Sequence, residues 1–219
     1  MEIKAADVAK LRKMTGAGMM DCKKALIEAD GDYDKAQDII RERGKLVAAK
    51  RADRSATEGV VVSKIVGQKG YMLCLACETD FVAKNSEFSA TANEILDIAI
   101  AADAADLEAL NAVAADGRTV ADKVTEKSGQ TGEKVELVYY AKLEAPMCVT
   151  YIHTNHKLGT LIGFNKEIGM EVAKDVAMQA AAMAPISISR EDCDPAVIEH
   201  ERSIGREQAR LDGKPEAML

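Results

Sequence analysis

The motif with the clearest chemical potential in this sequence is Cys74-Leu75-Ala76-Cys77. A CxxC pair can bind zinc or carry out dithiol redox chemistry, provided that both sulfur atoms lie on one side of the chain. Here the pair lies in a run that predicts a β-strand, where residues at an odd spacing point to opposite faces. A second ligand pair is hard to find, because His153 and His156 belong to a different predicted hairpin. We therefore expect unpaired, metal-free thiols, and keep a zinc-binding or redox-active cytoplasmic protein as the alternative.

No other group of residues predicts an enzyme. Gly16-Ala17-Gly18 is rich in glycine, but no predicted strand precedes it and no Gly-Lys-Ser/Thr follows it, so it does not predict a phosphate-binding loop. The chain has only three histidines, and no serine is set up as a nucleophile. We expect no catalytic residue, no metal and no cofactor, and a protein that acts by binding another protein.

Composition narrows the class of partner. The 219 residues carry a formal net charge of −7, and basic residues cluster only at Lys45, Lys50, Arg51 and Arg54, which we interpret as a solvated face. Direct binding of nucleic acid is not expected, because it normally needs a basic surface. The sequence has no apolar signal segment and no apolar run long enough to cross a bilayer. The five scattered cysteines favour the reducing cytoplasm.

Two short motifs could instead bind a protein. Asp80-Phe81-Val82 places one of three phenylalanines beside an acid, where a predicted strand gives way to a loop before a helix. The ring could be an exposed binding anchor or could fill the junction of strand and helix, and the residues alone do not separate the two. Met19 and Met20 are adjacent on a predicted helix and point about 100° apart. We expect one to pack inward while the other, flanked by Lys23 and Lys24, faces a partner.

Three short helices are predicted to position the methionine pair. The first ends at the turn Thr15–Gly18, and the second runs from about Met19 to Ala29. Asp32 can cap the third, which is expected to stop at Gly44. Residues 45–58 are interpreted as a helical tail that becomes a linker. A module of this size buries little surface, so it is expected to dock onto something.

An α+β architecture is predicted to position Phe81. The β-rich runs Val60–Val66 and Tyr71–Cys77 flank Gly67-Gln68-Lys69-Gly70, which predicts a hairpin, and a long helix follows to about Ala104. Residues 107–129 are interpreted as one polar, helical stretch. A strand over residues 134–143 is expected to place Tyr139 on the same face as Val135 and Leu137.

The pattern of a hairpin followed by a helix occurs a second time, over residues 147–165 and 169–184, which predicts two similar halves built on antiparallel strands. Asp194-Pro195 is a good helix start, and a new apolar pattern begins at Ala217-Met218-Leu219. The sequence stops where a returning helix would start, and we expect a truncated chain. The expected domains are residues 1–54 (three helices), 55–144 (first α+β half), 145–190 (second half, incomplete) and 191–219 (start of a helical hairpin).

Two long motifs in this chain resemble the elongation factor Ts family. They are Thr15-Gly16-Ala17-Gly18-Met19-Met20-Asp21-Cys22-Lys23-Lys24-Ala25-Leu26 and Thr79-Asp80-Phe81-Val82-Ala83-Lys84, and the order of modules agrees over nearly the whole chain. The resemblance implies a ubiquitin-associated-like three-helix domain, two core subdomains and no enzymatic activity. It also implies guanine-nucleotide exchange on the GTPase elongation factor Tu. A scaffold that binds ubiquitin-like partners without altering nucleotide affinity remains a further alternative.

The resemblance also assigns residues. It implies that Leu11, Arg12, Met19, Met20 and Lys23 contact the nucleotide domain of elongation factor Tu. It implies that Thr79, Asp80, Phe81 and Val82 dislodge magnesium, with Phe81 as the intruding side chain. His153, in the Tyr151-x-His153 stretch, is implied as a second contact of the core. The oligomeric state of the complex is left open.

Overall fold

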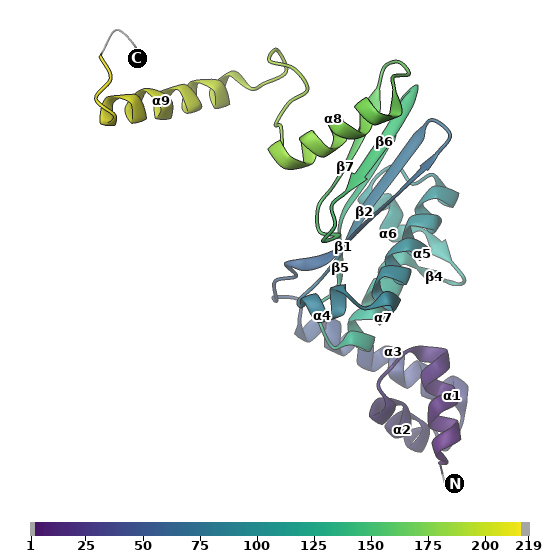
Figure 1. Cartoon of the computed structure of the whole chain (residues 1–219). Helices are drawn as coiled ribbons and strands as arrows, with labels where there is room; N and C mark the ends of the chain where they lie inside the picture. Colours follow the sequence, from purple (N-terminus) through teal and green to yellow (C-terminus); the bar gives the residue numbers. More distant parts are fainter. Residues whose placement is uncertain (1–2, 216–219) are drawn as a thin grey trace. The chain divides into compact units, whose positions relative to one another are not determined.

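The computed structural model of the protein has an α+β fold with antiparallel sheets, as predicted (Figure 1). The structure describes residues 3–215. The chain separates into two compact units, residues 1–181 and 182–219. The helices of the first unit are α1 (Ala5–Thr15), α2 (Met19–Glu28), α3 (Tyr33–Lys50), α4 (Asp80–Ala83), α5 (Ser86–Ala102), α6 (Leu107–Ala112) and α7 (Val120–Thr131), with most of α8 (Met170–Met183). The strands are β1 (Glu58–Val66), β2 (Lys69–Cys77), β3 (Ala114–Ala115), β4 (Arg118–Thr119), β5 (Glu136–Glu144), β6 (Met147–Ile152) and β7 (Gly159–Phe164).

The three N-terminal helices form a small core of their own. Gly16 has a φ of +66° and lets the chain turn between α1 and α2. The Asp32 carboxylate accepts hydrogen bonds from the first turn of α3, as predicted. The buried side chains are Val8, Leu11, Ala17, Cys22, Ala25, Leu26, Ala29 and Ala36.

The prediction that α3 stops at Gly44 is wrong, because the helix continues to Lys50. Gly44 is buried inside the helix, where it faces Gly129 of α7. A Cβ on Gly129 would lie 2.4 Å from the Gly44 Cα atom, so the glycines permit a close crossing of the two helices. Gln130 adds a hydrogen bond of 2.7 Å from its Nε2 to the carbonyl oxygen of Thr15. The N-terminal helices thus dock directly onto the first α+β layer.

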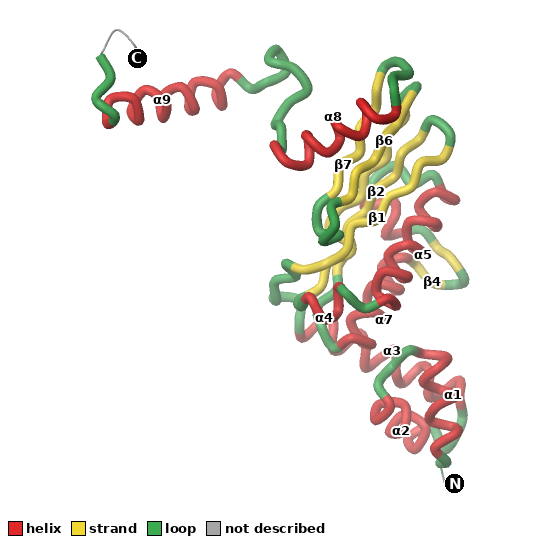
Figure 2. The backbone as a smooth tube through the Cα atoms, in the orientation of Figure 1, coloured by secondary structure: helices red, strands yellow, loops and turns green. Residues whose placement is uncertain are grey.

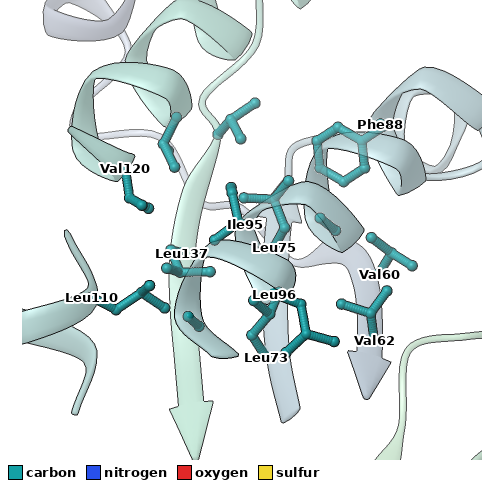
Figure 3. Packing of buried hydrophobic residues seen from close by; sticks show 14 of the residues in the cluster. Val60, Val62, Leu73, Leu75, Phe88, Ile95, Leu96, Leu110, Val120 and Leu137 are labelled. Atoms are coloured by element: carbon teal, nitrogen blue, oxygen red, sulfur yellow. The ribbon is translucent and has the colours of Figure 1, made fainter. Parts of the chain in front are cut away.

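The main sheet has the order β1-β2-β5, with antiparallel pairing throughout. Figure 2 shows its strands β1 and β2 in yellow. Gly67, with a φ of +61°, opens the tight turn between β1 and β2. One face of the sheet is covered by α5, α6 and α7. Figure 3 shows the side chains that fill this layer, including Val60, Leu73, Leu75, Phe88, Ile95, Leu96, Leu110, Val120 and Leu137.

A β-bulge in β5 overturns the prediction for Tyr139. Cys74 pairs with Tyr139 while the next residue of β2, Leu75, pairs with Leu137, so β5 carries an extra residue at this point. The bulge shifts the alternation of side chains. Tyr139 is 74% exposed although Leu137 is buried, and Tyr140 packs against the core instead.

The prediction of one helical stretch over residues 107–129 is wrong. The short hairpin β3–β4 separates α6 from α7. Its turn is Asp116-Gly117, and both residues have positive φ angles, of +55° and +76°. Asp-Gly is a strong signal for such a turn, so this hairpin was visible in the sequence.

The β6–β7 hairpin and α8 form the predicted second repeat of hairpin and helix. Val149 packs against Ala173 and Ala177 of α8 in a separate buried cluster. The backbone N–H of Val61 in β1 donates to the carbonyl oxygen of His156, at 2.7 Å. The β6–β7 loop therefore reaches the edge of the main sheet.

The second unit contains α9 (Pro195–Leu211), capped by Asp194 with Pro195 at its first position, as predicted. Ala217-Met218-Leu219 lies outside the described residues. Within residues 3–215, no helix is both long and apolar enough to cross a membrane.

Candidate partner-binding surface

Phe81 is the most exposed aromatic side chain in the first unit, with 84% of its surface accessible. It lies in α4, a four-residue helix where a loop was predicted. Thr79 caps this helix through a hydrogen bond to its Oγ1 from the Val82 N–H, at 3.5 Å. Val82 turns toward the core and is partly buried. The interpretation in which Phe81 fills the strand–helix junction is therefore wrong, because Val82 takes that position.

Asp80, beside the ring, carries an exposed ion pair. Its carboxylate accepts a hydrogen bond of 2.6 Å from the ammonium group of Lys84, one turn later. This bond is the main reason that the pKa of Asp80 is lowered. The carboxylate is therefore ionised at neutral pH. Exposed ion pairs contribute little net energy, so Asp80 can change partners at small cost.

Two residues that sequence reasoning assigned no role hold the start of α4. Glu133, just after α7, accepts hydrogen bonds from the backbone N–H groups of Glu78 and Thr79. Arg51, just after α3, donates two hydrogen bonds to the Glu78 carboxylate, at 2.8 and 3.0 Å. The interpretation of the basic cluster as a solvated face is therefore wrong for Arg51. Both residues are far from Phe81 in the sequence, so only long-range packing reveals them.

Met19 and Met20 are both exposed, at 57% and 62%. The prediction that one packs inward is wrong, because the buried face of α2 begins a turn later, with Cys22. Arg12 and Lys23 are also exposed and remain available for a contact. Leu11 is fully buried. A direct contact by the Leu11 side chain is therefore excluded in this structure, and the residue belongs to the core of α1–α3.

His153 lies at the start of the exposed β6–β7 loop. Its Nδ1 is 2.9 Å from the hydroxyl oxygen of Tyr151, and its backbone N–H donates to the Leu158 carbonyl oxygen. The loop is fixed to β1 by the hydrogen bond between Val61 and His156 and by an ion pair between Lys157 and Glu58. His153 is thus exposed to solvent on a loop that hydrogen bonds and an ion pair attach to β1.

An open groove of about 530 Å³ connects the β6–β7 loop to the helix that carries Phe81. The residues that line it include Asp80 and Lys84 at the two ends of α4, and Asn155, His156 and Lys157 in the β6–β7 loop. Of the predicted site residues, Asp80 lines this groove, whereas Phe81 and His153 do not. Met19 and Met20 do not line it.

Cys74 and Cys77 do not form a paired site. Cys77 is buried with Leu73 and Leu75 in the core, whereas Cys74 lies on the other face of β2 and is half-buried. Desolvation raises the pKa of both thiols, and that of Cys77 reaches about 12. A protonated, buried thiol is a poor nucleophile and a poor metal ligand. The part of the chain that the structure describes contains no cluster of His, Cys, Asp and Glu suited to a metal ion.

Comparison with known proteins places the chain among protein-synthesis factors. The family model "Elongation factor TS" matches residues 78–219. The elongation factor Ts of Porphyromonas gingivalis is 47% identical over 220 residues, which cover 100% of this chain and 80% of that protein. This chain belongs to the elongation factor Ts family. The elongation factor Ts of Cytophaga hutchinsonii is 46% identical, over 99% of this chain and 80% of that protein. That of Bacteroides thetaiotaomicron is 46% identical, over 97% of this chain and 64% of that protein.

Membership in the elongation factor Ts family makes the chain a translation elongation factor. The family model begins at Glu78, so it contains α4 and the β6–β7 loop. The relatives extend the similarity through α1–α3, since one of them covers all of the chain. All three exposed contact candidates, at Met19–Met20, Phe81 and His153, therefore lie in segments shared with elongation factor Ts proteins.

Proposed function

We propose that this chain is a guanine-nucleotide exchange factor that binds elongation factor Tu with GDP, displaces its magnesium ion and promotes GDP release, so that GTP can bind. The observation that carries this proposal is the 84% exposure of Phe81. An exposed ring on a capped helical turn is an anchor without a partner in the isolated chain. A few anchor residues supply most of the binding energy of protein interfaces, and aromatic side chains are enriched there.

The chemistry of the turn fits a magnesium pocket. Phe81 supplies an apolar wedge, and the ionised Asp80 supplies a carboxylate beside it. A ring inserted next to a metal–phosphate site displaces polar groups that hold the metal, and a nearby carboxylate repels phosphate oxygens. Both effects favour the nucleotide-free state of the GTPase. No covalent step is required, so the proposed activity is not enzymatic in the chain itself.

Thermodynamic linkage gives the size of the effect. If the factor weakens nucleotide binding by a given ratio, the nucleotide weakens factor binding by the same ratio. Each tenfold of this antagonism requires about 1.4 kcal/mol of differential contact energy. Two or three aromatic or methionine anchors can supply a thousandfold effect.

We assign the supporting contacts to two further surfaces. Met19 and Met20, with Arg12 and Lys23, are proposed to contact the nucleotide domain from residues 1–54. His153 is proposed as a second contact of the core, in residues 145–190. Phe81 belongs to residues 55–144, and residues 191–219 are proposed to begin a helical hairpin. Elongation factor Tu is the proposed partner and the cytoplasm the proposed location, with no direct contact to nucleic acid.

The test is the release of labelled GDP from elongation factor Tu, measured with and without this chain at fixed magnesium concentration. We expect the chain to accelerate release, and excess magnesium to reduce the acceleration. Binding without any change in GDP release would support the scaffold alternative. Stoichiometric zinc in the purified chain, together with unchanged GDP release, would support the alternative based on Cys74 and Cys77.

A further inference from the structure

The backbone before α4 has no partner in the sheet. The pairing of β1 with β2 ends at Cys77, opposite Glu58. Glu78 and Thr79 follow this last pair, so their N–H groups have no strand to donate to. Partly buried N–H groups need an acceptor, because leaving them unpaired costs free energy.

Glu133 supplies the missing acceptors from a different element. One carboxylate oxygen, Oε2, accepts hydrogen bonds from the N–H of Glu78, at 3.1 Å, and from the N–H of Thr79, at 3.0 Å. The other, Oε1, accepts the hydroxyl hydrogen of Thr79, at 2.6 Å. Hydrogen bonds to a carboxylate are stronger than those between neutral groups. All three donors lie in the two residues that lead into α4.

The bond to the Thr79 hydroxyl also sets the orientation of the helix cap. Because Thr79 donates its hydroxyl hydrogen to Glu133, an oxygen lone pair remains for the N–H of Val82. This cap fixes the first turn of α4 and therefore the direction of Phe81. The α4 helix is too short to be stable by itself. Its shape must come from such contacts.

The segment that carries Glu133 is itself tied down. The backbone N–H of Glu133 donates to Thr131 Oγ1, at 3.3 Å, and the buried hydroxyl of Ser128 accepts the N–H of Val135, at 3.0 Å. In return, the N–H of Lys134 donates to the Glu78 carboxylate, at 2.6 Å. The carboxylate of each segment thus accepts hydrogen bonds from the backbone of the other segment. Supporting residues hold a functional group in place in this way.

We propose that Glu133 is a positioning residue for nucleotide exchange, which holds Thr79 and α4 in the one conformation that presents Phe81 to the partner. The inference deepens the proposed function and rests on it. Without Glu133, the turn should sample other conformations. The apparent efficiency of the factor then falls in proportion to the fraction of molecules that keep the competent shape.

The test is a double-mutant cycle of Glu133→Ala and Phe81→Ala in the full chain, measured by stimulated GDP release. We expect Glu133→Ala alone to slow release about tenfold. In the Phe81→Ala background, the same change should cost less than about twofold, because the variant has no ring left to misplace. Equal losses in both backgrounds would overturn the inference, and so would no loss in either.

Two variants separate positioning from general stability. Glu133→Gln keeps an oxygen for the two N–H groups and should restore most of the release rate. Asp103→Asn is the matched control, since Asp103 is a carboxylate that accepts hydrogen bonds from Lys69 and Tyr71 at the other end of β2. It should lower stability without slowing GDP release. Slower release by Asp103→Asn, to the same extent as by Glu133→Ala, would count against a specific role.

Amide hydrogen exchange provides a readout that does not depend on the partner. Glu133→Ala should accelerate exchange at the N–H groups of Thr79 and Val82 relative to the rest of the sheet. If this acceleration is seen but the unmodified chain leaves GDP release unchanged, the proposed function fails while the structural role stands. If GDP release responds to Phe81→Ala but not to Glu133→Ala, only the inference fails.

Discussion

Gly129 of α7 and Gly44 of α3 meet in an asymmetric contact. A Cβ on Gly129 would lie 2.4 Å from the Gly44 Cα atom, whereas a Cβ on Gly44 would lie 3.5 Å from the Gly129 Cα atom. The first separation is a clash with backbone, which cannot be relieved by rotating a side chain. The second is an ordinary van der Waals contact. The two glycines thus have different requirements although they share one interface.

Gly129→Ala should therefore destabilise the chain by about 1–3 kcal/mol, because α3 and α7 must move apart. Gly44→Ala should be neutral or stabilising by up to about 1 kcal/mol, since alanine favours the helix and fits the space. Urea unfolding followed by circular dichroism measures both free energies. Equal changes for the two variants would show that the helices do not cross as closely as described.

Phe81→Ala and Phe88→Ala should separate binding from folding. Phe81 is exposed, so its removal should change the free energy of unfolding by less than about 0.5 kcal/mol. It should slow stimulated GDP release on the order of 30-fold, which corresponds to an anchor worth about 2 kcal/mol. Phe88 lies on the buried face of α5, and its truncation should cost roughly 3–5 kcal/mol of stability. Unchanged GDP release by Phe81→Ala, at full occupancy of the partner, would refute the wedge.

The double variant Met19→Ala, Met20→Ala should leave the fold intact, because both side chains are exposed. If these residues contact the nucleotide domain, stimulated GDP release should fall about tenfold, a loss of about 1.4 kcal/mol. Leu46→Ala serves as control, since Leu46 is an exposed apolar residue on α3 outside this surface. Equal losses from Leu46→Ala would mean that the effect does not depend on the surface of α1 and α2.

Cys77 should resist thiol reagents in the native protein. With its pKa raised to about 12, only about one molecule in ten thousand carries the thiolate at pH 8, which is over a thousandfold less than for an ordinary thiol. Ellman's reagent should modify the half-buried Cys193 early, and all five cysteines only after unfolding. Raising the pH above about 8.5 should lower the free energy of unfolding, because the Cys77 thiol loses its proton at a lower pH in the unfolded state than in the folded state. Fast modification of Cys74 and Cys77 as a pair would revive the redox alternative.

Local sequence signals predicted the elements that depend on local chemistry. Asp32 and Asp194 cap helices where the sequence indicated, and the hairpin turn begins at Gly67 as expected. The odd spacing of Cys74 and Cys77 predicted their separation onto two faces of β2. These features depend on neighbours within a few residues, which a single sequence displays.

Features that depend on distant partners were not predictable in this way. Gly44 was taken for a helix stop, because its partner Gly129 lies in another helix. Tyr139 was predicted on the same face as Val135 and Leu137, because the bulge that turns it outward is defined only by pairing with β2. No local sequence pattern points to Glu133, and only the fold reveals that its carboxylate accepts hydrogen bonds from Thr79.

The close crossing of α3 over α7, together with the bond from Arg51 to Glu78, has a thermodynamic consequence for recognition. A partner that binds Met19, Met20 and Phe81 together loses its translational and rotational entropy once, for both contacts. If a flexible tether replaced these contacts, the second contact would form at an effective concentration that the tether's length sets. The crossing also fixes the distance between Met19–Met20 and Phe81. It rejects partners whose two receptor patches are spaced differently, even when each patch alone is complementary.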